Sequence, residues 1–360
     1  MAITRVTQRM LTDQSYHAVD SNLTRLAADQ LVLDTGKRIN KPSDDPSGTT
    51  TALRARVGIA NNDQYQRNAS DGLGWLTTID SALQTVNTQA TKAYTIALKG
   101  ANTGTNPQDA QDALADEINQ IRAAIYATSN SNYLGRPVFG GTTTNTSAYA
   151  AVGYWTDGSG NKVVLPSGTT QADATTADGA TQTDGSGNTY TFHADGTSDT
   201  ADPTTVIAYT GDSGSVSRRV GADTVVRVDS SGDDVFGGGS SGSDSIFDTL
   251  ARLSAALTNT AVGATGTTTE GIEQGIADVK AFMSRLSGAQ ADEGARMNKI
   301  TQATTVSQDQ SLALETTRSN AEDADFAWAA IQLQSQSTAY QAALAATSKT
   351  VQPSLLDFLG

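Results

Sequence analysis

The residues with the clearest chemical potential form two short acidic motifs. The hexapeptide Thr-Asp-Gly-Ser-Gly-Asn occurs at 156–161 and again at 183–188. It places oxygen-bearing side chains at alternate positions, as a calcium-binding loop does. Such a loop also needs Gly at its sixth position and a bidentate acid at its twelfth, whereas Lys162 and Thr189 occupy the sixth positions here and no Glu follows at the twelfth. The motif therefore favours a hairpin turn over a cation site.

The other reactive side chains do not form a recognisable site. The Gly-rich run at 237–242 lacks the Lys of a phosphate-binding P-loop, so we interpret it as a connector. The acidic pairs Asp44-Asp45 and Asp233-Asp234 are chain neighbours and do not converge on a substrate. The chain has no Cys, and its two histidines are far apart in sequence. We therefore predict no catalytic, metal or cofactor site, and no enzyme.

Net charge and hydropathy argue against further classes of protein. The chain of 360 residues carries 24 Lys and Arg against 38 Asp and Glu, a net charge of −14. This acidic balance argues against binding to nucleic acid or to an anionic membrane surface. No window approaches the ~20 apolar residues that a membrane-spanning helix needs. The first residues, MAITRVTQRMLTDQ, lack the apolar core of a cleavable signal peptide, so we expect none.

The chain has helical ends and a different middle. Gly, Thr, Ser and Asp dominate the middle, and short β-branched runs occur at 162–165, 188–192, 204–210 and 223–228. We predict a mainly α fold, a long coiled-coil rod formed by the N- and C-terminal arms with a small inserted β domain. The expected domains are an N-terminal arm (1–40), N-terminal rod helices (41–135), the β domain (136–245), C-terminal rod helices (246–303) and a C-terminal arm (304–360).

Heptad spacing supports the rod. One apolar seam runs from Leu76 to Ala97, and a second runs from Ile272 to Ile300 with interruptions at Gln290 and Glu293. A spacing of 3.5 residues keeps one face of a helix toward a partner helix. Ordinary amphipathic helices of a bundle are the alternative for any single stretch. Residues 305–349 contain neither Gly nor Pro, which predicts an uninterrupted helix.

A turn is expected where GKRINKPSDDP begins at Gly36. Gly36 is placed to end one helix, Ser43 or Asp44 to cap the next, and Pro46 to lie in its first turn. Asn106-Pro107 begins another helix in the same way. We assign the turn between the arm layer and the rod layer to Pro42, Ser43, Asp44, Asp45 and Pro46.

Both arms carry thin apolar seams on polar helices. Such helices gain little from intrinsic propensity, so we expect them to become ordered by packing on each other or on neighbouring subunits. The residues predicted to form the subunit interface are the apolar positions of the two arms. They are Ile3, Val6, Met10, Leu23, Leu26, Phe326, Ile331, Leu333, Tyr340, Leu344, Val351, Leu355, Leu356 and Phe358.

Several segments together resemble the flagellin superfamily. They are MAITRVTQRML at the start, GKRINKPSDDPSG (36–48), DGLGWL (71–76), NSNYLGRPVFGGT (130–142), GDDVFGG (232–238), SIFDTLARLSAAL (245–257), GARMNKI (294–300) and the C-terminal AYQAALAATSKTVQPSLLDFLG (339–360). The resemblance covers roughly 1–142 and 230–360. Residues 3–7 and 354–359 are more similar to the hook–filament junction branch of the superfamily than to filament flagellins.

The resemblance implies a structural adaptor of the bacterial flagellum that joins hook to filament by polymerising through its terminal helices. It also implies export through the flagellar type III apparatus to an extracellular position. The implied partners are copies of itself, a hook-associated protein on the hook side, flagellin on the filament side and an export chaperone. Two alternatives stay open: a divergent flagellin that forms the filament, and a secreted adhesin that acts through the β domain.

Overall fold

The structure is a computed structural model that describes residues 8–102, 107–143, 147–165, 175–184, 187–195, 199–238, 245–258 and 268–359. The side chains of residues 8, 9, 11, 12, 268, 269 and 349–359 are outside this description. The chain forms two compact units. The first unit comprises Met1–Gln64 with Ser307–Gly360, and the second comprises Tyr65–Val306.

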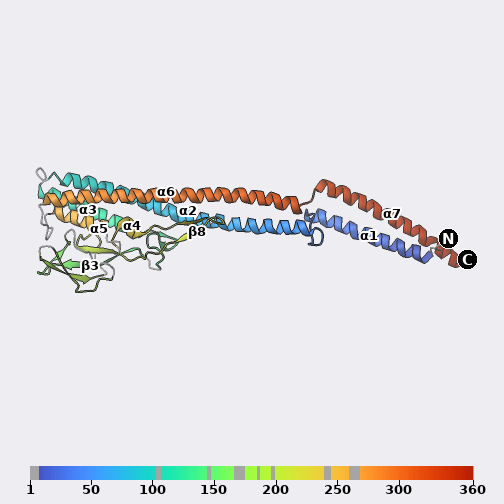
Figure 1. The fold of residues 1–360 in the computed structure, drawn as a ribbon, viewed down its shortest axis with the longest axis horizontal. Helices are drawn as coiled ribbons and strands as arrows, with labels where there is room; N and C mark the ends of the chain where they lie inside the picture. Colours follow the sequence, from blue (N-terminus) through green and yellow to red (C-terminus); the bar gives the residue numbers. More distant parts are fainter. Residues whose placement is uncertain are drawn as a thin grey trace. The chain divides into compact units, whose positions relative to one another are not determined.

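Long helices dominate both ends of the chain (Figure 1). In chain order they are α1 (Gln8–Thr35), α2 (Pro46–Gly100), α3 (Gln108–Ser129), the short α4 (Gly232–Phe236), α5 (Ile246–Leu257), α6 (Thr268–Glu322) and α7 (Phe326–Leu359). In the first unit α1 and α7 lie side by side, and in the second α3 packs against α5. No described helix is long and apolar enough to cross a membrane. The predicted class, mainly α with a β region in the middle, is confirmed.

The predicted seams form the core of the second unit. On α2, the described side chains of Leu76, Ile79, Leu83 and Val86 are fully buried, and the small residues Ala90, Ala93 and Ala97 continue the same face. On α6, buried positions of the predicted seam include Ile272, Val279, Leu286 and Ile300. The spacing of three and four residues puts each set on one helical face, which explains why these helices bury that face together.

The middle of the chain builds antiparallel sheets. The described strands are β1 (Asn132–Tyr133), β2 (Arg136–Pro137), β3 (Tyr149–Thr156), β4 (Lys162–Val163), β5 (Thr181–Thr183), β6 (Thr189–Ala194), β7 (Thr205–Tyr209), β8 (Ser217–Arg219) and β9 (Val225–Arg227). One sheet has the order β4-β3-β6-β5, with β7 pairing on β3; β1 pairs with β2, and β8 with β9. The four β-branched runs predicted as strands contain β4, β7 and β9 and overlap β6, which extends two residues further. The central strand β3 was not predicted.

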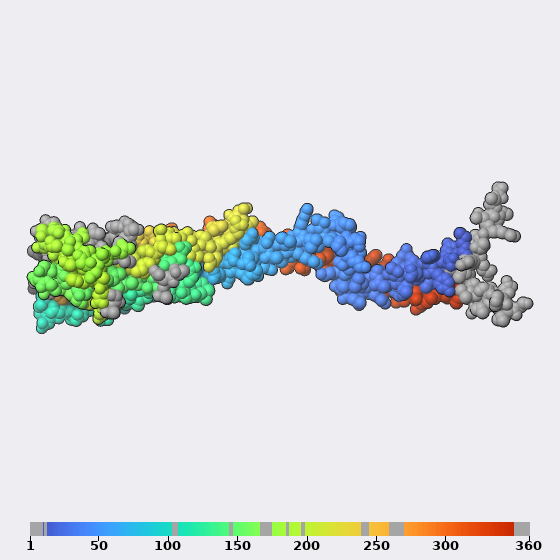
Figure 2. Space-filling model, turned by 90° about the horizontal axis from the view of Figure 1, so that it is seen from below, coloured from blue at the N-terminus to red at the C-terminus, as the bar shows by residue number. Residues whose placement is uncertain are grey.

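The β region contributes to two separate hydrophobic clusters. Tyr149, Ile207 and Val228 belong to the same core as α2, α3, α5 and α6. The second, smaller cluster consists of Trp155, Val163, Leu165, Tyr190, Phe192 and Val206. In the space-filling view, the green and yellow segments from the middle of the chain cover this side of the second unit (Figure 2). Part of the inserted region is therefore integral to the main core.

The two acidic hexapeptides are hairpin turns, as predicted. Asp157 Oδ1 accepts hydrogen bonds from the backbone N–H groups of Ser159 and Asn161, at 2.9 and 2.8 Å. Asp184 Oδ1 accepts one from the backbone N–H of Asn188 at 2.9 Å. These bonds close the turns between β3 and β4 and between β5 and β6. The carboxylates are thus engaged in shaping the turns.

Two sequence predictions of helix boundaries were wrong. The stretch 305–349 is broken at 323–325, because Ala324 N–H donates to Gly36 O at 2.9 Å and Asp325 Oδ1 accepts from the N–H groups of Ala327 and Trp328. Asp325 thereby caps α7. The cap of α2 is Asp45, rather than Ser43 or Asp44, since its Oδ1 accepts from Gly48 N–H at 2.9 Å. Gly36 (φ 68°) follows the end of α1, as predicted.

Candidate assembly surface

The helices α1 and α7, called the arm pair here, pack along a thin heptad seam. On α1 the half-buried positions Ser15, Val19, Asn22, Leu26, Asp29 and Leu33 follow each other at alternating spacings of four and three. On α7 the corresponding positions are Ala329, Leu333, Gln336, Tyr340, Ala343 and Thr347. Gln336 Nε2 donates to Asn22 Oδ1 at 3.3 Å across the seam. A polar pair in such a seam fixes the register of the two helices.

The arm pair leaves most of its apolar side chains uncovered. Among the described side chains of α1 and α7, Ala329 alone is buried. Large apolar side chains that are 40–70% exposed occur along both helices: Met10, Tyr16, Leu23, Leu31, Phe326, Trp328, Ile331 and Leu344. An apolar surface of this kind marks a site of association. In Figure 2 the surface of this part of the molecule is shared by the blue α1 and the red α7.

The predicted interface residues fall into three groups. Met10, Leu23, Phe326, Ile331 and Leu344 are exposed. Leu26, Leu333 and Tyr340 are half-buried along the seam between α1 and α7. Ile3 and Val6 lie outside the described residues, and Val351, Leu355, Leu356 and Phe358 lie in α7 with side chains outside the described part of the structure. Leu333 and Tyr340 thus lie on the seam, seven residues apart, whereas Leu344 lies next to the seam residue Ala343.

The sequence of α7 carries a further signal of burial. From Phe326 to Ser348 there is no Asp, Glu, Lys or Arg, although most of these side chains are exposed in the single chain. An ordinary solvent-facing surface has roughly 25–35% charged residues. The amino-acid composition of this stretch is that of a buried helix, but most of its side chains are exposed to solvent in the single chain. This absence of charge is visible in the sequence and would have indicated the surface without any structure.

A compact joint links the arm pair to the adjoining ends of α2 and α6 within the first unit. Arg38 N–H donates to Glu322 O at 2.7 Å, and Lys37 and Asp323 form an antiparallel bridge. The carboxylate of Glu322 is buried and lies next to three cations. They are Lys37 (3.5 Å), Arg318 (3.7 Å) and Arg56, which donates a short hydrogen bond. Sequence reasoning missed the pairing of Glu322 with Lys37 and Arg56 because these residues are far from Glu322 in the chain, whereas Arg318 precedes it by four residues on α6.

The predicted turn residues are part of this joint. Asp44 Oδ2 accepts from the backbone N–H groups of Asn40 and Lys41, at 3.1 and 2.7 Å. Asp45 Oδ2 accepts from Arg38 Nη2 at 3.1 Å, and the same Nη2 donates to Ala321 O at 2.6 Å. The Gly48 N–H and then the Arg38 guanidinium lower the pKa of Asp45. Pro46 is the first residue of α2, while Pro42 and Ser43 lie in the turn before it.

A buried cation holds the β region to the helices of the second unit. Arg122 on α3 is fully buried, and its Nε donates to Phe247 O at 2.9 Å. Its Nη1 donates to the carbonyl oxygens of Thr200 and Asp202, at 2.9 and 3.0 Å, and its Nη2 donates to Thr205 O. Burial lowers the pKa of Arg122 to about 10, so it stays charged at neutral pH.

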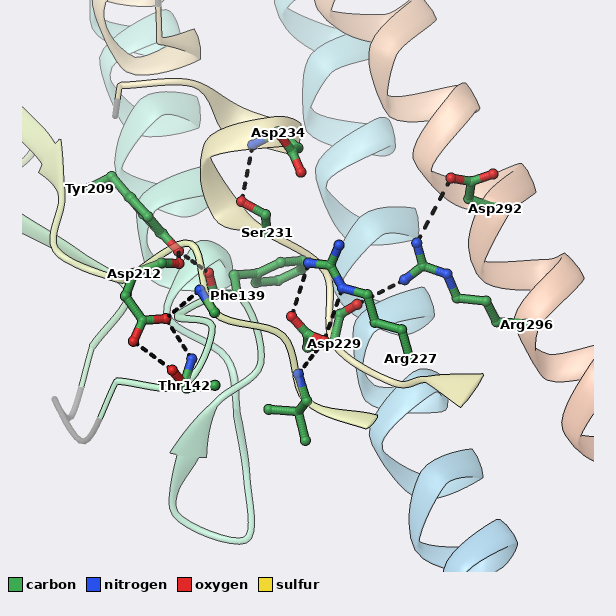
Figure 3. A network of polar contacts seen from close by, with 12 residues as sticks. Phe139, Thr142, Tyr209, Asp212, Arg227, Asp229, Ser231, Asp234, Asp292 and Arg296 are labelled. Atoms are coloured by element: carbon green, nitrogen blue, oxygen red, sulfur yellow. Dashed lines mark hydrogen bonds and ion pairs between the residues drawn. The ribbon is translucent and has the colours of Figure 1, made fainter. Parts of the chain in front are cut away.

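A second polar network anchors the return of the chain from the β region (Figure 3). The buried carboxylate of Asp229 accepts from Val216 N–H at 2.7 Å and from Arg227 Nε and Nη2, both at 3.0 Å. Asp229 O accepts from Arg296 Nη1 of α6 at 2.8 Å. The hydroxyl of Tyr209 donates toward Phe139 O and Asp212 O, at 3.1 and 3.0 Å. These bonds attach the β region to Phe139 and to Arg296, which belong to two motifs of the family resemblance.

Glu293, noted above as an interruption of the α6 seam, lies close to this network. It is 1% exposed, and its Oε1 has no hydrogen-bond partner in the described part of the chain. Burial raises the pKa of Glu293 from 4.5 to about 7; Arg296 and Arg227 oppose the rise, and Asp80 and Asp229 add to it. The charged form is thus disfavoured in the folded state.

Because its pKa is raised in the folded state, Glu293 should make the stability of the protein depend on pH. The folded state holds the proton that the unfolded state releases near pH 4.5, so the free energy of unfolding falls as the pH rises from 4.5 to about 7. We expect a loss of about 3 kcal/mol, and Glu293→Gln should remove most of it. Urea unfolding at pH 5 and pH 8 measures the difference. The exposed Glu117→Gln is the control; equal pH slopes for wild type and Glu293→Gln would contradict the assignment.

Comparisons with known proteins agree with this architecture. Residues 6–144 match the family model of the bacterial flagellin N-terminal helical region, and residues 276–359 match that of the bacterial flagellin C-terminal helical region. A flagellin of Salmonella muenchen is 36% identical over 88 residues, which are 24% of this chain and 17% of that protein. A flagellin of Halalkalibacterium halodurans is 34% identical over 89 residues, 25% of this chain and 32% of that protein. The matches thus span less than a third of either relative.

Solved structures resemble the fold over a larger share of the chain. A flagellar hook-associated protein from Vibrio parahaemolyticus aligns with a TM-score of 0.57 at 15% identity, over 78% of this chain and 100% of that one. Bacillus cereus FlgL aligns with a TM-score of 0.50 at 16% identity, over 74% of this chain and 99% of that one. The helical regions at both chain ends are those of the bacterial flagellins, and the β region lies between them. The chain belongs to the flagellin superfamily, and it is a structural flagellar protein.

Proposed function

We propose that this chain is the adaptor that joins the hook to the filament of the bacterial flagellum, and that it polymerises through the arm pair. The observation that carries the proposal is α7, which has no charged residue from Phe326 to Ser348 and yet exposes Phe326, Trp328, Ile331 and Leu344. Covering these side chains with other copies gains hydrophobic free energy of about 25 cal/mol per Å² of apolar surface.

The proposed assembly is open rather than closed. The arm pair presents apolar side chains on more than one face of α7, so a subunit has surface for neighbours on different sides. Head-to-tail contacts of this kind generate helical layers. We infer two unlike neighbours, a hook-associated protein on the hook side and flagellin on the filament side, and an extracellular position on the flagellum. Before assembly an export chaperone would cover the same apolar residues.

A divergent flagellin is the second candidate. The relatives matched in sequence are flagellins, and both family models describe flagellin regions. The fold likeness to a hook-associated protein and to FlgL, together with the chain ends at 3–7 and 354–359, supports the adaptor.

One experiment separates the two candidates. The purified chain, carrying a fluorescent label, is added to isolated hooks that bear the preceding hook-associated protein. An adaptor stops polymerising after it has formed a narrow layer at the hook tip. It then permits a filament to grow from added flagellin. Continuous growth of a labelled filament from this chain alone would instead establish a flagellin.

A further inference from the structure

The tip of the β1–β2 hairpin is the most unusual exposed feature of the second unit. Asn132 pairs with Pro137 and Tyr133 with Arg136, which leaves Leu134 and Gly135 as a two-residue turn. Both turn residues have positive φ, 50° for Leu134 and 79° for Gly135. Such turns favour Asn or Asp before Gly, because a branched apolar side chain is strained in the left-handed region. Among the described residues outside glycine, Leu134 alone has a positive φ.

The Leu134 side chain is also 81% exposed, the most exposed of the large apolar side chains in the described structure. The strained backbone and the exposed apolar side chain both cost free energy in the single chain. Strained residues persist where the surrounding structure holds them for a function. The base of the hairpin is held firmly, since Tyr133 packs on Trp75 with ring centroids 5.6 Å apart and the Arg136 guanidinium lies 5.7 Å from the centre of the Trp75 ring.

A matching cavity exists in the first unit. It has a volume of about 150 Å³ and lies beside the joint, lined by Asp29, Val32, Arg38, Ala324, Asp325, Trp328 and Ala329. A volume of about 150 Å³ is large enough for a group the size of benzene, so a leucine side chain fits. Two carboxylates at the lining, Asp29 and Asp325, complement the exposed Arg136 of the hairpin, whereas Arg38 is engaged with Asp45.

We propose that Leu134 of one copy inserts into the cavity beside the joint of a neighbouring copy. The proposal rests on self-assembly of this chain, as proposed above, and adds a specific contact to it. An apolar knob on one unit and a cavity on the other cannot pair symmetrically, so they produce head-to-tail contacts that do not close. Insertion covers the Leu134 side chain and gives the strained turn a role in the assembly.

The first test removes the knob and improves the turn. Leu134→Asn replaces an apolar side chain by one that tolerates positive φ, so the purified variant should melt at or above the wild-type temperature. Flagella from cells whose only copy of the gene carries Leu134→Asn should contain the chain at a level reduced about tenfold or more. Leu134→Met, which keeps an apolar side chain, is the matched control. A wild-type level of Leu134→Asn in flagella would overturn the proposal.

The second test identifies the cavity. The chain has no cysteine, so a disulfide can form only between introduced residues, and the two single-cysteine variants show how much cross-linking joins like residues. Flagella that contain Leu134→Cys with Ala324→Cys, a cavity residue, should yield covalent dimers and larger chains on oxidation, and dissociated monomers should not. Leu134→Cys with the exposed Ala327→Cys is the control. Absence of dimers for the cavity pair would overturn the proposal, whereas absence of the wild-type chain from the hook–filament region would refute the proposed function itself.

Discussion

Replacing Arg122 by Met should lower the free energy of unfolding of the second unit by more than any other substitution discussed here. The substitution keeps most of the side-chain volume but leaves the carbonyl oxygens of Phe247, Thr200, Asp202 and Thr205 without their buried donor. Unpaired buried acceptors retain their desolvation cost, and removing one partner of a buried charged group costs about 3–5 kcal/mol. We expect a loss of about 4 kcal/mol in the free energy of unfolding.

Two controls sharpen this prediction. Arg122→Lys keeps the charge but loses the planar fork that reaches several carbonyl groups, so it should give an intermediate loss. Lys92→Met removes an exposed cation from α2 in the same unit and should change stability by less than about 0.5 kcal/mol. Urea unfolding followed by tryptophan fluorescence, to which the buried Trp75 and Trp155 of the second unit contribute, measures all three variants. Equal midpoints for Arg122→Met and Lys92→Met would show that Arg122 does not hold the β region in place.

Leu344→Asp should abolish incorporation into flagella while leaving the isolated chain folded. Leu344 is 44% exposed, so a carboxylate there meets water in the single chain. In an assembly that covers α7, the same carboxylate is buried without a partner, at a cost of several kcal/mol. We expect the amount of chain in isolated flagella to fall by about a hundredfold or more.

Incorporation of Leu344→Asp is measured by quantitative immunoblotting of sheared flagella, with circular dichroism of the purified chain as the test of folding. Leu344→Met is the matched control, because it conserves volume and apolar character and should assemble normally. If Leu344→Asp reached flagella in wild-type amounts, the face of α7 that carries Leu344 would not be part of the interface.

Local patterns in the sequence predicted the helices and the seams because these features repeat over a few residues. Leu76, Leu83 and Ile300 are buried where the heptad spacing predicted. The strand β3 was missed because Ala150, Ala151 and Gly153 interrupt its alternation, and its register on β7 shifts between Ala151 and Gly153. The predicted domain boundaries and interface residues remain predictions.

Long-range polar contacts could not be predicted from sequence. The partners of Arg122 are carbonyl groups between 78 and 125 residues away, and any residue type supplies a carbonyl. The carboxylate of Glu322 likewise accepts a hydrogen bond from Arg56, which lies 266 residues earlier in the chain. One feature was readable and overlooked: Asp325 directly precedes the apolar start of α7, which is an ordinary N-cap signal.

The β region contributes side chains to two separate hydrophobic clusters, and this affects how its role should be tested. Removing the whole middle segment would also remove Tyr149, Ile207 and Val228 from the main core. An excision that asks whether the region binds an outside partner, as an adhesin would, should therefore be confined to β4, β5 and β6. The apolar side chains of β4 and β6 belong to the separate smaller cluster, which they share with Trp155 of β3 and Val206 of β7.

The break between α6 and α7 has a consequence for the order of folding. No Gly or Pro lies at 323–325, and the break depends on Gly36 and Arg38, which hydrogen-bond to the backbone of Ala324 and Glu322. Within the C-terminal segment Asp325 supplies a local cap for α7, but the hydrogen bonds of Ala324 and Glu322 need Gly36 and Arg38 as partners. We therefore expect the corner to become fixed only once the loop that follows α1 has docked, a step that requires both ends of the chain.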